Sequence, residues 1–160
     1  MQNIFSNSSL ISKTGLISSA SHPFQGKEVA LYFAAAWCPM CANFTPHLKE
    51  FYNNNARNVE IVLISSDLSK ESAEAHFLRD NGDWLSVAYG DDILDVLKAR
   101  FKIWSGREAS KFGHHRRSGI PSLVLITESG DELAYLNTER DGKEIFKQWE
   151  NLPQENKWTC

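Results

Sequence analysis

The chain has 160 residues, of which 42% are hydrophobic and 23% charged, and its formal net charge is −3. A chain of this length usually forms one domain that buries roughly 70% of its unfolded surface. The charge argues against a whole-chain nucleic-acid footprint, and no apolar run approaches the ~18 residues that span a membrane. Three cysteines are too few for a disulfide scaffold, and their odd number favours a reducing compartment.

The first 27 residues contain no acid, two lysines and seven serines, a composition faintly like that of an organelle transit peptide. They lack arginine. They also lack a charged segment followed by an apolar stretch and a small-residue cleavage site, so we reject a secretory signal. We therefore expect a cytoplasmic protein, with the nucleus and an organelle as the alternatives left open.

A buried strand is predicted at residues 29–34, a short run of aliphatic and aromatic side chains. The run stops at Trp37 and Cys38. Pro39 then fits the first position of a helix, because proline has no N–H to leave unpaired there. Apolar residues repeat at helical spacing as far as the three asparagines at 53–55. The pattern predicts a strand, a sharp turn and a helix.

Strands and helices continue to alternate after this unit. Strands are predicted at residues 59–65, 84–88, 121–127 and 132–137, and helices at residues 69–80, 91–101 and 141–150. The last two strands form an antiparallel hairpin. This order implies an α/β sandwich with a mixed sheet, one domain of residues 1–150. Residues 151–160 are expected to be a polar, loosely held tail that ends in a free thiol, Cys160.

Residues 102–119 fit no regular element, and we interpret them as a basic loop insertion. The window from residue 100 to residue 117 holds six of the 17 Lys and Arg residues and one acid, Glu108, so it carries +5. The remainder of the chain then carries −8. The small net charge therefore conceals an acidic body and a basic segment.

Cys38 and Cys41 lie three residues apart at the start of the predicted helix, close enough for a disulfide. Cys38 is expected to be exposed, and its thiolate would face unpaired N–H groups and the positive end of the helix dipole, which lowers its pKa. Cys41 lies inside the helix and is expected to be shielded. We predict that Cys38 attacks a partner disulfide and that Cys41 resolves the mixed disulfide.

Two alternatives for this cysteine pair stay open. The cysteines could be buried apolar side chains without redox chemistry. A zinc site would need two more ligands, and the adjacent His114 and His115 lack the usual separation of about three to five residues. We predict no metal site, and no cofactor beyond the redox-active pair itself.

Residues 31–52 contain Tyr-Phe, three small residues, Trp-Cys-Pro-x-Cys and then Phe-Thr-Pro-x-Leu-x-Glu-Phe-Tyr. This sequence resembles the tryparedoxin and nucleoredoxin branch of the thioredoxin superfamily. Similar likenesses occur at residues 10–15, 62–67, 84–87 and 119–123, which weakens the transit-peptide interpretation. The resemblance implies a thioredoxin-like fold, with a central mixed β-sheet flanked by helices and an N-terminal hairpin extension.

The resemblance also implies a cis bond between Ile120 and Pro121 beside the Cys38 sulfur, where the Ile120 backbone would pair with an extended partner peptide. Otherwise, Pro121 simply starts a strand. Trp37 belongs either to the docking surface or to the packing of the strand–helix junction. Met40 stands where the family usually has a second proline, and offers partners an adaptable apolar contact.

Proton transfer from Cys41 has two candidates. Tyr32 stands six residues before Cys38, where many thioredoxins carry a buried aspartate, so the chain lacks that base. Asp67 is a candidate by family position, with a turn or capping aspartate as the alternative. Ser66 replaces a tryptophan of the family.

In family members, a handful of residues connects the helix that ends near Phe101 to the Ile-Pro turn. Here residues 102–119 intervene, and this insertion is the chain's largest departure from the family. Because it leads to Pro121, its cations can meet a docking partner: Arg107, Lys111, Arg116 and Arg117. We hypothesise that they steer an acidic protein or a phosphorylated surface toward Cys38. The alternative is a mobile, solvated loop with incidental charge.

The sequence thus predicts a tryparedoxin-like protein dithiol–disulfide oxidoreductase that reduces or exchanges disulfides of partner proteins, with peroxidase-type partners included by resemblance. A dithiol donor, either a low-molecular-weight thiol or a reductase, would supply its electrons. The alternative is a non-catalytic thioredoxin-fold adaptor or redox sensor that binds partners through the basic loop. We expect a monomer, and neither a membrane nor nucleic acid as a partner.

Overall fold

The computed structural model describes residues 2–160, and its seven strands form one mixed sheet in the order β2-β1-β5-β4-β3-β6-β7. The strands are β1 (Leu10–Ser12), β2 (Gly15–Leu16), β3 (Glu28–Ala34), β4 (Val59–Ser65), β5 (Leu85–Val87), β6 (Ser122–Ile126) and β7 (Glu132–Leu136). The central strands β3, β4 and β5 are parallel, whereas the outer pairings are antiparallel. The predicted mixed sheet and the N-terminal hairpin, β1 with β2, are both confirmed.

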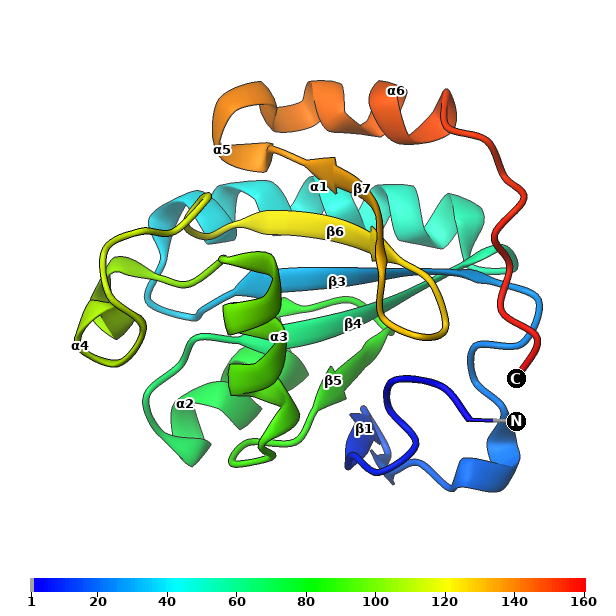
Figure 1. Ribbon diagram of the computed structural model, residues 1–160, viewed down its shortest axis with the longest axis horizontal. Coiled ribbons are helices and arrows are strands. Elements are labelled where there is room, and N and C mark those ends of the chain that lie inside the picture. The colour runs from blue at the N-terminus through cyan, green and yellow to red at the C-terminus, as the bar shows by residue number, and fades with distance from the viewer. Residues whose placement is uncertain (1) are drawn as a thin grey trace.

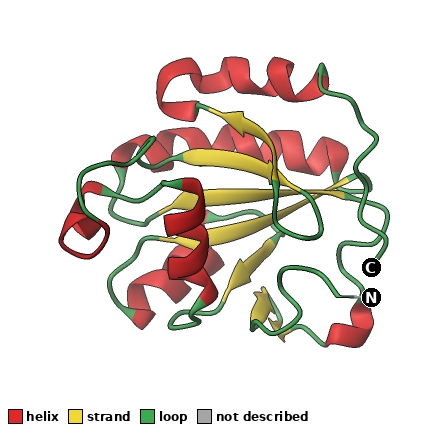
Figure 2. Ribbon diagram, in the orientation of Figure 1, coloured by secondary structure: helices red, strands yellow, loops and turns green. Residues whose placement is uncertain are grey.

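Helices cover both faces of the sheet: α1 (Pro39–Asn55), α2 (Lys70–Ala75), α3 (Ile93–Phe101), α4 (Ala109–Phe112), α5 (Thr138–Asp141) and α6 (Ile145–Glu150). In Figure 1, α3 crosses the front of the sheet, whereas α1 and α6 lie together behind and above it, and Figure 2 shows these layers by element type. Aromatic rings join α1 to α6, with the centroids of Phe51 and Trp149 4.6 Å apart. No helix among residues 2–160 is both long and apolar enough to cross a membrane.

Two predicted helices are interrupted. The helix expected at residues 69–80 begins as α2, with Ser69 as its N-cap residue. It continues as a π-helical turn, His76–Asp80. The last helix is α6, reached through α5 and a 3₁₀ turn, Gly142–Glu144.

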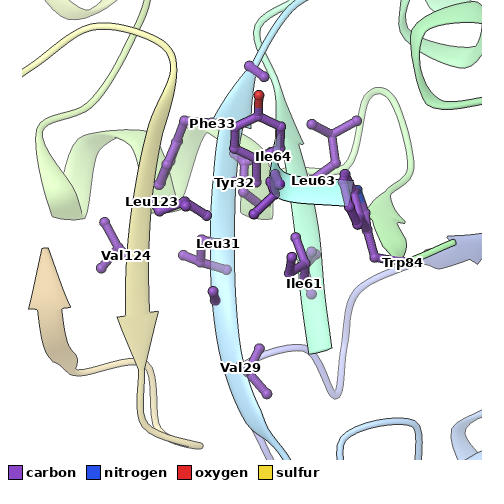
Figure 3. Packing of buried hydrophobic residues seen from close by; sticks show 14 of the residues in the cluster. Val29, Leu31, Tyr32, Phe33, Ile61, Leu63, Ile64, Trp84, Leu123 and Val124 are labelled. Atoms are coloured by element: carbon purple, nitrogen blue, oxygen red, sulfur yellow. The ribbon is translucent and has the colours of Figure 1, made fainter. Parts of the chain in front are cut away.

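The core lies around β3 and β4, whose residues are all buried. Strands covered on both faces lose the polar alternation of a half-exposed strand, which accounts for their apolar runs. Figure 3 shows Leu31 and Tyr32 of β3 beside Ile61 and Leu63 of β4, with Trp84 at the edge of the group. The strand that carries the chain toward the two cysteines is thus fixed from both sides.

The segment 102–119 is folded against the body of the domain. It contains a 3₁₀ turn, Gly106–Glu108, followed directly by α4, so the expectation that it fits no regular element is wrong. The indole N–H of Trp104 donates to the carbonyl of Gly113 (3.0 Å), and its ring stacks on Phe112. These contacts join distant parts of the insertion, which is why sequence periodicity does not show them.

The expectation of a loose tail over residues 151–160 is wrong at Trp158. This side chain is 2% exposed, with ring centroids 4.8 Å from Phe24 and 6.3 Å from Phe5. Its indole N–H donates to the Ile126 carbonyl (3.2 Å), and its backbone N–H to that of Lys27 (2.9 Å). One large aromatic residue buries enough apolar surface to hold a segment that is otherwise polar.

Both ends of the chain meet at Glu128, in the turn between β6 and β7. Its carbonyl accepts the backbone N–H of Ile4 (2.7 Å), and its carboxylate accepts the thiol of Cys160 (3.2 Å). This hydrogen bond raises the pKa of the Cys160 thiol. Figure 1 shows the two termini together at the end of the sheet opposite the start of α1.

Candidate active site

The two cysteines lie where β3 passes into α1. Cys38 is the N-cap residue of α1 and Pro39 the first helical residue, as predicted. The Cys38 sulfur accepts the backbone N–H of Cys41 at 3.1 Å, and both residues are free thiols. Cys41 is fully buried, as expected, whereas Cys38 is 6% exposed rather than open to solvent. The expectation that Cys38 is exposed is therefore wrong, because the folded chain covers most of this side chain.

The two thiols have opposite proton affinities. A hydrogen bond from the Cys41 side chain lowers the pKa of Cys38 most; burial opposes this shift, and the N–H groups of Cys41 and Met40 add to it. The same hydrogen bond, followed by burial, raises the pKa of Cys41. Cys38 is therefore the group favoured as a thiolate, while Cys41 holds its proton.

The loop before β6 faces the Cys38 sulfur. The bond between Ile120 and Pro121 is cis, as the resemblance implies, and the Ile120 carbonyl oxygen lies 3.8 Å from the Cys38 sulfur. Met40 is 48% exposed, and Trp37 is half-buried. The sulfur, the Ile120 carbonyl and two apolar side chains that flank Cys38 in the sequence are thus available at this turn.

Tyr32 reaches the cysteines only through a hydroxyl chain. Its hydroxyl lies 2.8 Å from that of Thr45, which donates to the Cys41 carbonyl at 2.8 Å. Burial raises the pKa of Tyr32, and the two nearby thiols raise it further. Tyr32 therefore keeps its proton, and its hydroxyl is linked through Thr45 to the Cys41 carbonyl.

Asp67 holds the turn after β4 against the turn that carries the cysteines. Its carboxylate accepts the N–H of Ala36 (3.0 Å) and the hydroxyl of Ser72 (2.8 Å), and lies 3.4 Å from Nδ1 of His76. Burial alone would raise the pKa of Asp67, but these groups outweigh it and lower the pKa. The carboxylate also raises the pKa of Cys41, so it acts on the site through charge.

Sequence reasoning missed His76. The residue belongs to the π-helical turn and is 3% exposed. A helix of regular pitch was expected there, so nothing in the pattern placed its ring beside Asp67. It is one of the buried polar groups that hold this end of the sheet together.

Of the four cations assigned to partner steering, Arg107 lies on the residue before Cys38, and Arg116 lies beside Gly119, just before the cis bond. The guanidinium of Arg107 lies over the ring of Trp37, 4.2 Å from its centroid. The other three contact the chain itself: Lys111 pairs with Asp95, Arg116 donates to the Trp104 carbonyl (2.7 Å), and Arg117 pairs with Glu132 (2.7 Å). Among residues 2–160, no group of three or more His, Cys, Asp or Glu side chains is placed to hold a metal ion.

Among known protein families, the family model described as thioredoxin-like matches residues 26–132 of this chain. The chain is 37% identical over 108 residues to the probable nucleoredoxin 1 of Arabidopsis thaliana, covering 66% of this chain and 16% of that protein. It is 43% identical over 82 residues to the tryparedoxin of Trypanosoma brucei brucei, covering 50% of this chain and 54% of that protein.

The chain thus spans less than two thirds of either relative. Among solved structures, tryparedoxin II complexed with glutathionylspermidine superimposes with a TM-score of 0.67 at 27% identity, over 91% of each chain. The fold of the whole domain and the match over more than half of its sequence agree. We conclude that this chain belongs to the thioredoxin-like family, with tryparedoxins and nucleoredoxins among its relatives.

Proposed function

We propose that the protein is a thiol–disulfide oxidoreductase that reduces or exchanges disulfides of partner proteins through Cys38 and Cys41. The observation that carries the proposal is the pairing of a sulfur held at a helix N-terminus, 3.1 Å from the Cys41 N–H, with a second, fully buried thiol. One thiol is favoured as an anion and the other as an acid, which a two-step exchange requires.

In the first step, the Cys38 thiolate attacks one sulfur of a partner disulfide. A bond forms between Cys38 and that sulfur, the partner's S–S bond breaks, and the other partner sulfur leaves as a thiolate. The Ile120 carbonyl supports this step, because it lies 3.8 Å from the reacting sulfur, where an extended partner segment can pair with it.

In the second step, Cys41 loses its proton and attacks the Cys38 sulfur. The mixed disulfide breaks, the second partner sulfur leaves and takes up a proton, and the Cys38–Cys41 disulfide remains. The partner gains two electrons and the protein loses two. The raised pKa of Cys41 delays its deprotonation until the mixed disulfide has formed.

A dithiol donor must then return two electrons to the Cys38–Cys41 disulfide. The solved relative that holds glutathionylspermidine supports a low-molecular-weight thiol as that donor, and a reductase is the other class. Peroxidase-type proteins are proposed as substrates by likeness to tryparedoxin. No bound cofactor takes part, because the cysteine pair carries the electrons.

The test is to trap partners with Cys41→Ser. This variant cannot resolve the mixed disulfide, so partners should accumulate as adducts of Cys38 that a reductant releases. Cys160→Ser is the matched control, because its thiol lies at Glu128, at the end of the sheet opposite the start of α1, and its loss should change neither trapping nor turnover. Cys38→Ala should abolish both.

A non-catalytic adaptor would give a different result. Its partners would stay bound after reduction, and Cys38→Ala would leave binding intact. Disulfide reduction by Cys38→Ala at the parent rate would refute the mechanism directly.

A further inference from the structure

Arg107 has the one side chain of the insertion that lies on the cysteine turn. Its guanidinium is exposed, lies 4.2 Å from the centroid of the Trp37 ring and has no ion-pair partner among residues 2–160. Trp37 directly precedes Cys38, and its indole N–H lies 3.4 Å from the Ser66 carbonyl, so the ring is held in place. A cation without an ion-pair partner therefore lies on the side chain of the residue that precedes Cys38.

The residue next to Arg107 fixes this position from inside the protein. Glu108 is 8% exposed and lies 2.6 Å from the ammonium of Lys98 on α3. It also accepts the backbone N–H and the hydroxyl of Ser105, each at 3.0 Å, which caps the 3₁₀ turn that carries Arg107. The backbone of Arg107 is thus anchored to α3, and this anchor limits the positions that its side chain can take over the Trp37 ring.

A guanidinium stacked on an aromatic face keeps its in-plane N–H groups free. Those N–H groups match the two oxygens of a carboxylate, with which arginine forms paired hydrogen bonds. Stacking also removes part of the conformational freedom that makes most surface ion pairs weak. Arg107 is consequently a better anion-binding group than an unattached surface cation.

The groove beyond Arg107 restricts where an anion can bind. It has a volume of about 470 Å³, and Asp91 and Asp92 line it together with Arg107. These two carboxylates repel an anion inside the groove. A partner carboxylate is therefore favoured outside the groove, at the in-plane edge of the Arg107 guanidinium beside Trp37.

We propose that Arg107 is a specificity-determining residue that favours protein disulfides with an Asp or Glu side chain next to the attacked cysteine. The inference rests on the proposed oxidoreductase function and adds the class of substrate to it. It replaces steering by four cations with recognition by one, because Lys111, Arg116 and Arg117 already contact the chain.

The test uses three synthetic peptides, each with one intramolecular disulfide, that differ only in the residue beside the first cysteine: Glu, Gln or Lys. The pre-reduced protein is mixed with each peptide, and the second-order rate constant of a single turnover is measured by acid quench and chromatography. Arg107→Ala and Arg107→Lys are compared with Arg57→Ala. Arg57 is the matched control, because it is exposed and follows the far end of α1.

The wild type should reduce the Glu peptide fastest and the Lys peptide slowest. Arg107→Ala should lose roughly three- to tenfold on the Glu peptide and little on the Gln peptide, the size expected for one charge-assisted contact. Arg107→Lys should keep part of the preference, because it keeps the charge without the planar fork. Added salt should weaken the preference for Glu, and Arg57→Ala should match the wild type.

Three results would overturn the inference and leave the function standing: one common wild-type rate for the peptides, a preference for Lys, or equal losses on every peptide in Arg107→Ala. Equal losses would mean that Arg107 only packs on Trp37. A wild type that reduces none of the peptides would instead contradict the proposed function, and the inference would fall with it.

Discussion

The ammonium of Lys98 and the carboxylate of Glu108 lie 2.6 Å apart, with side chains only 5% and 8% exposed. Burial alone would raise the pKa of Glu108, but the Lys98 charge and the surrounding hydrogen bonds outweigh it and lower the pKa. The Glu108 carboxylate is therefore favoured as the anion beside the Lys98 ammonium. It joins α3 to the insertion through the interior rather than across the surface.

Removing one partner of this pair should be costly. Lys98→Met leaves the Glu108 carboxylate buried without its cation and should lower the free energy of unfolding by about 3–5 kcal/mol. The double variant Lys98→Met with Glu108→Gln should recover much of that loss, because Gln keeps the cap on Ser105 without a charge. Urea unfolding measures both. Equal instability of the single and double variants would contradict an ionised pair.

Acid should weaken the same contact in a defined direction. The folded-state pKa of Glu108 lies below its ordinary value of 4.5. The stabilisation is therefore complete above that value and is lost as the pH falls through the folded-state pKa. Urea unfolding between pH 7 and pH 3 should show a smaller loss of stability for the double variant than for the wild type.

The reactivity of Cys38 should report its hydrogen bond from Cys41. The pKa of Cys38 is about 7, so alkylation by iodoacetamide should rise with pH around neutrality rather than near the ordinary thiol value of 9. Cys41→Ala removes the largest stabilising contact and should move the profile to higher pH. Cys41→Ser keeps a hydroxyl donor and should move it less. A profile in both variants that matches the wild type would exclude the Cys41 side chain as the cause.

Tyr32 should contribute to stability and not to proton transfer. Tyr32→Phe removes a fully buried hydroxyl and leaves that of Thr45 with the Cys41 carbonyl alone, at a cost of about 1–2 kcal/mol in unfolding free energy. The rate at which Cys41 resolves a mixed disulfide should stay within about twofold. A large fall in that rate at unchanged stability would identify Tyr32 as a proton carrier instead.

Trp158 should stabilise the whole domain, although it is the third residue from the end of the chain. Trp158→Ala removes a side chain packed on Phe5 and Phe24 and should cost about 3–5 kcal/mol. Lys157→Ala, one residue earlier, loses an exposed contact with Asn58 and should change stability by at most about 0.5 kcal/mol. Thermal unfolding of the two variants checks the contrast.

Sequence reasoning predicts the parts of this protein that depend on local pattern. The strand that ends before Cys38, the proline that starts α1 and the hairpin of β6 and β7 all follow from neighbouring residues. The cis bond between Ile120 and Pro121 was predicted from the family resemblance. The neighbouring residues alone also allow a proline that simply starts a strand.

Contacts between distant segments could not be predicted in this way. In the structure, Glu108 of the insertion lies 2.6 Å from Lys98 on α3, and Arg107 lies over the ring of Trp37. Neither contact follows from the residues next to it in the sequence, and only the folded chain places these groups together.

The meeting of both chain ends at Glu128 has a practical consequence for engineering. Ile4 and Cys160 lie at the end of the sheet opposite the start of α1, where Cys38 lies, so a fluorescent protein or affinity tag fused to either terminus would be attached far from the reactive sulfur. Such a fusion should leave the surface that meets a partner disulfide uncovered.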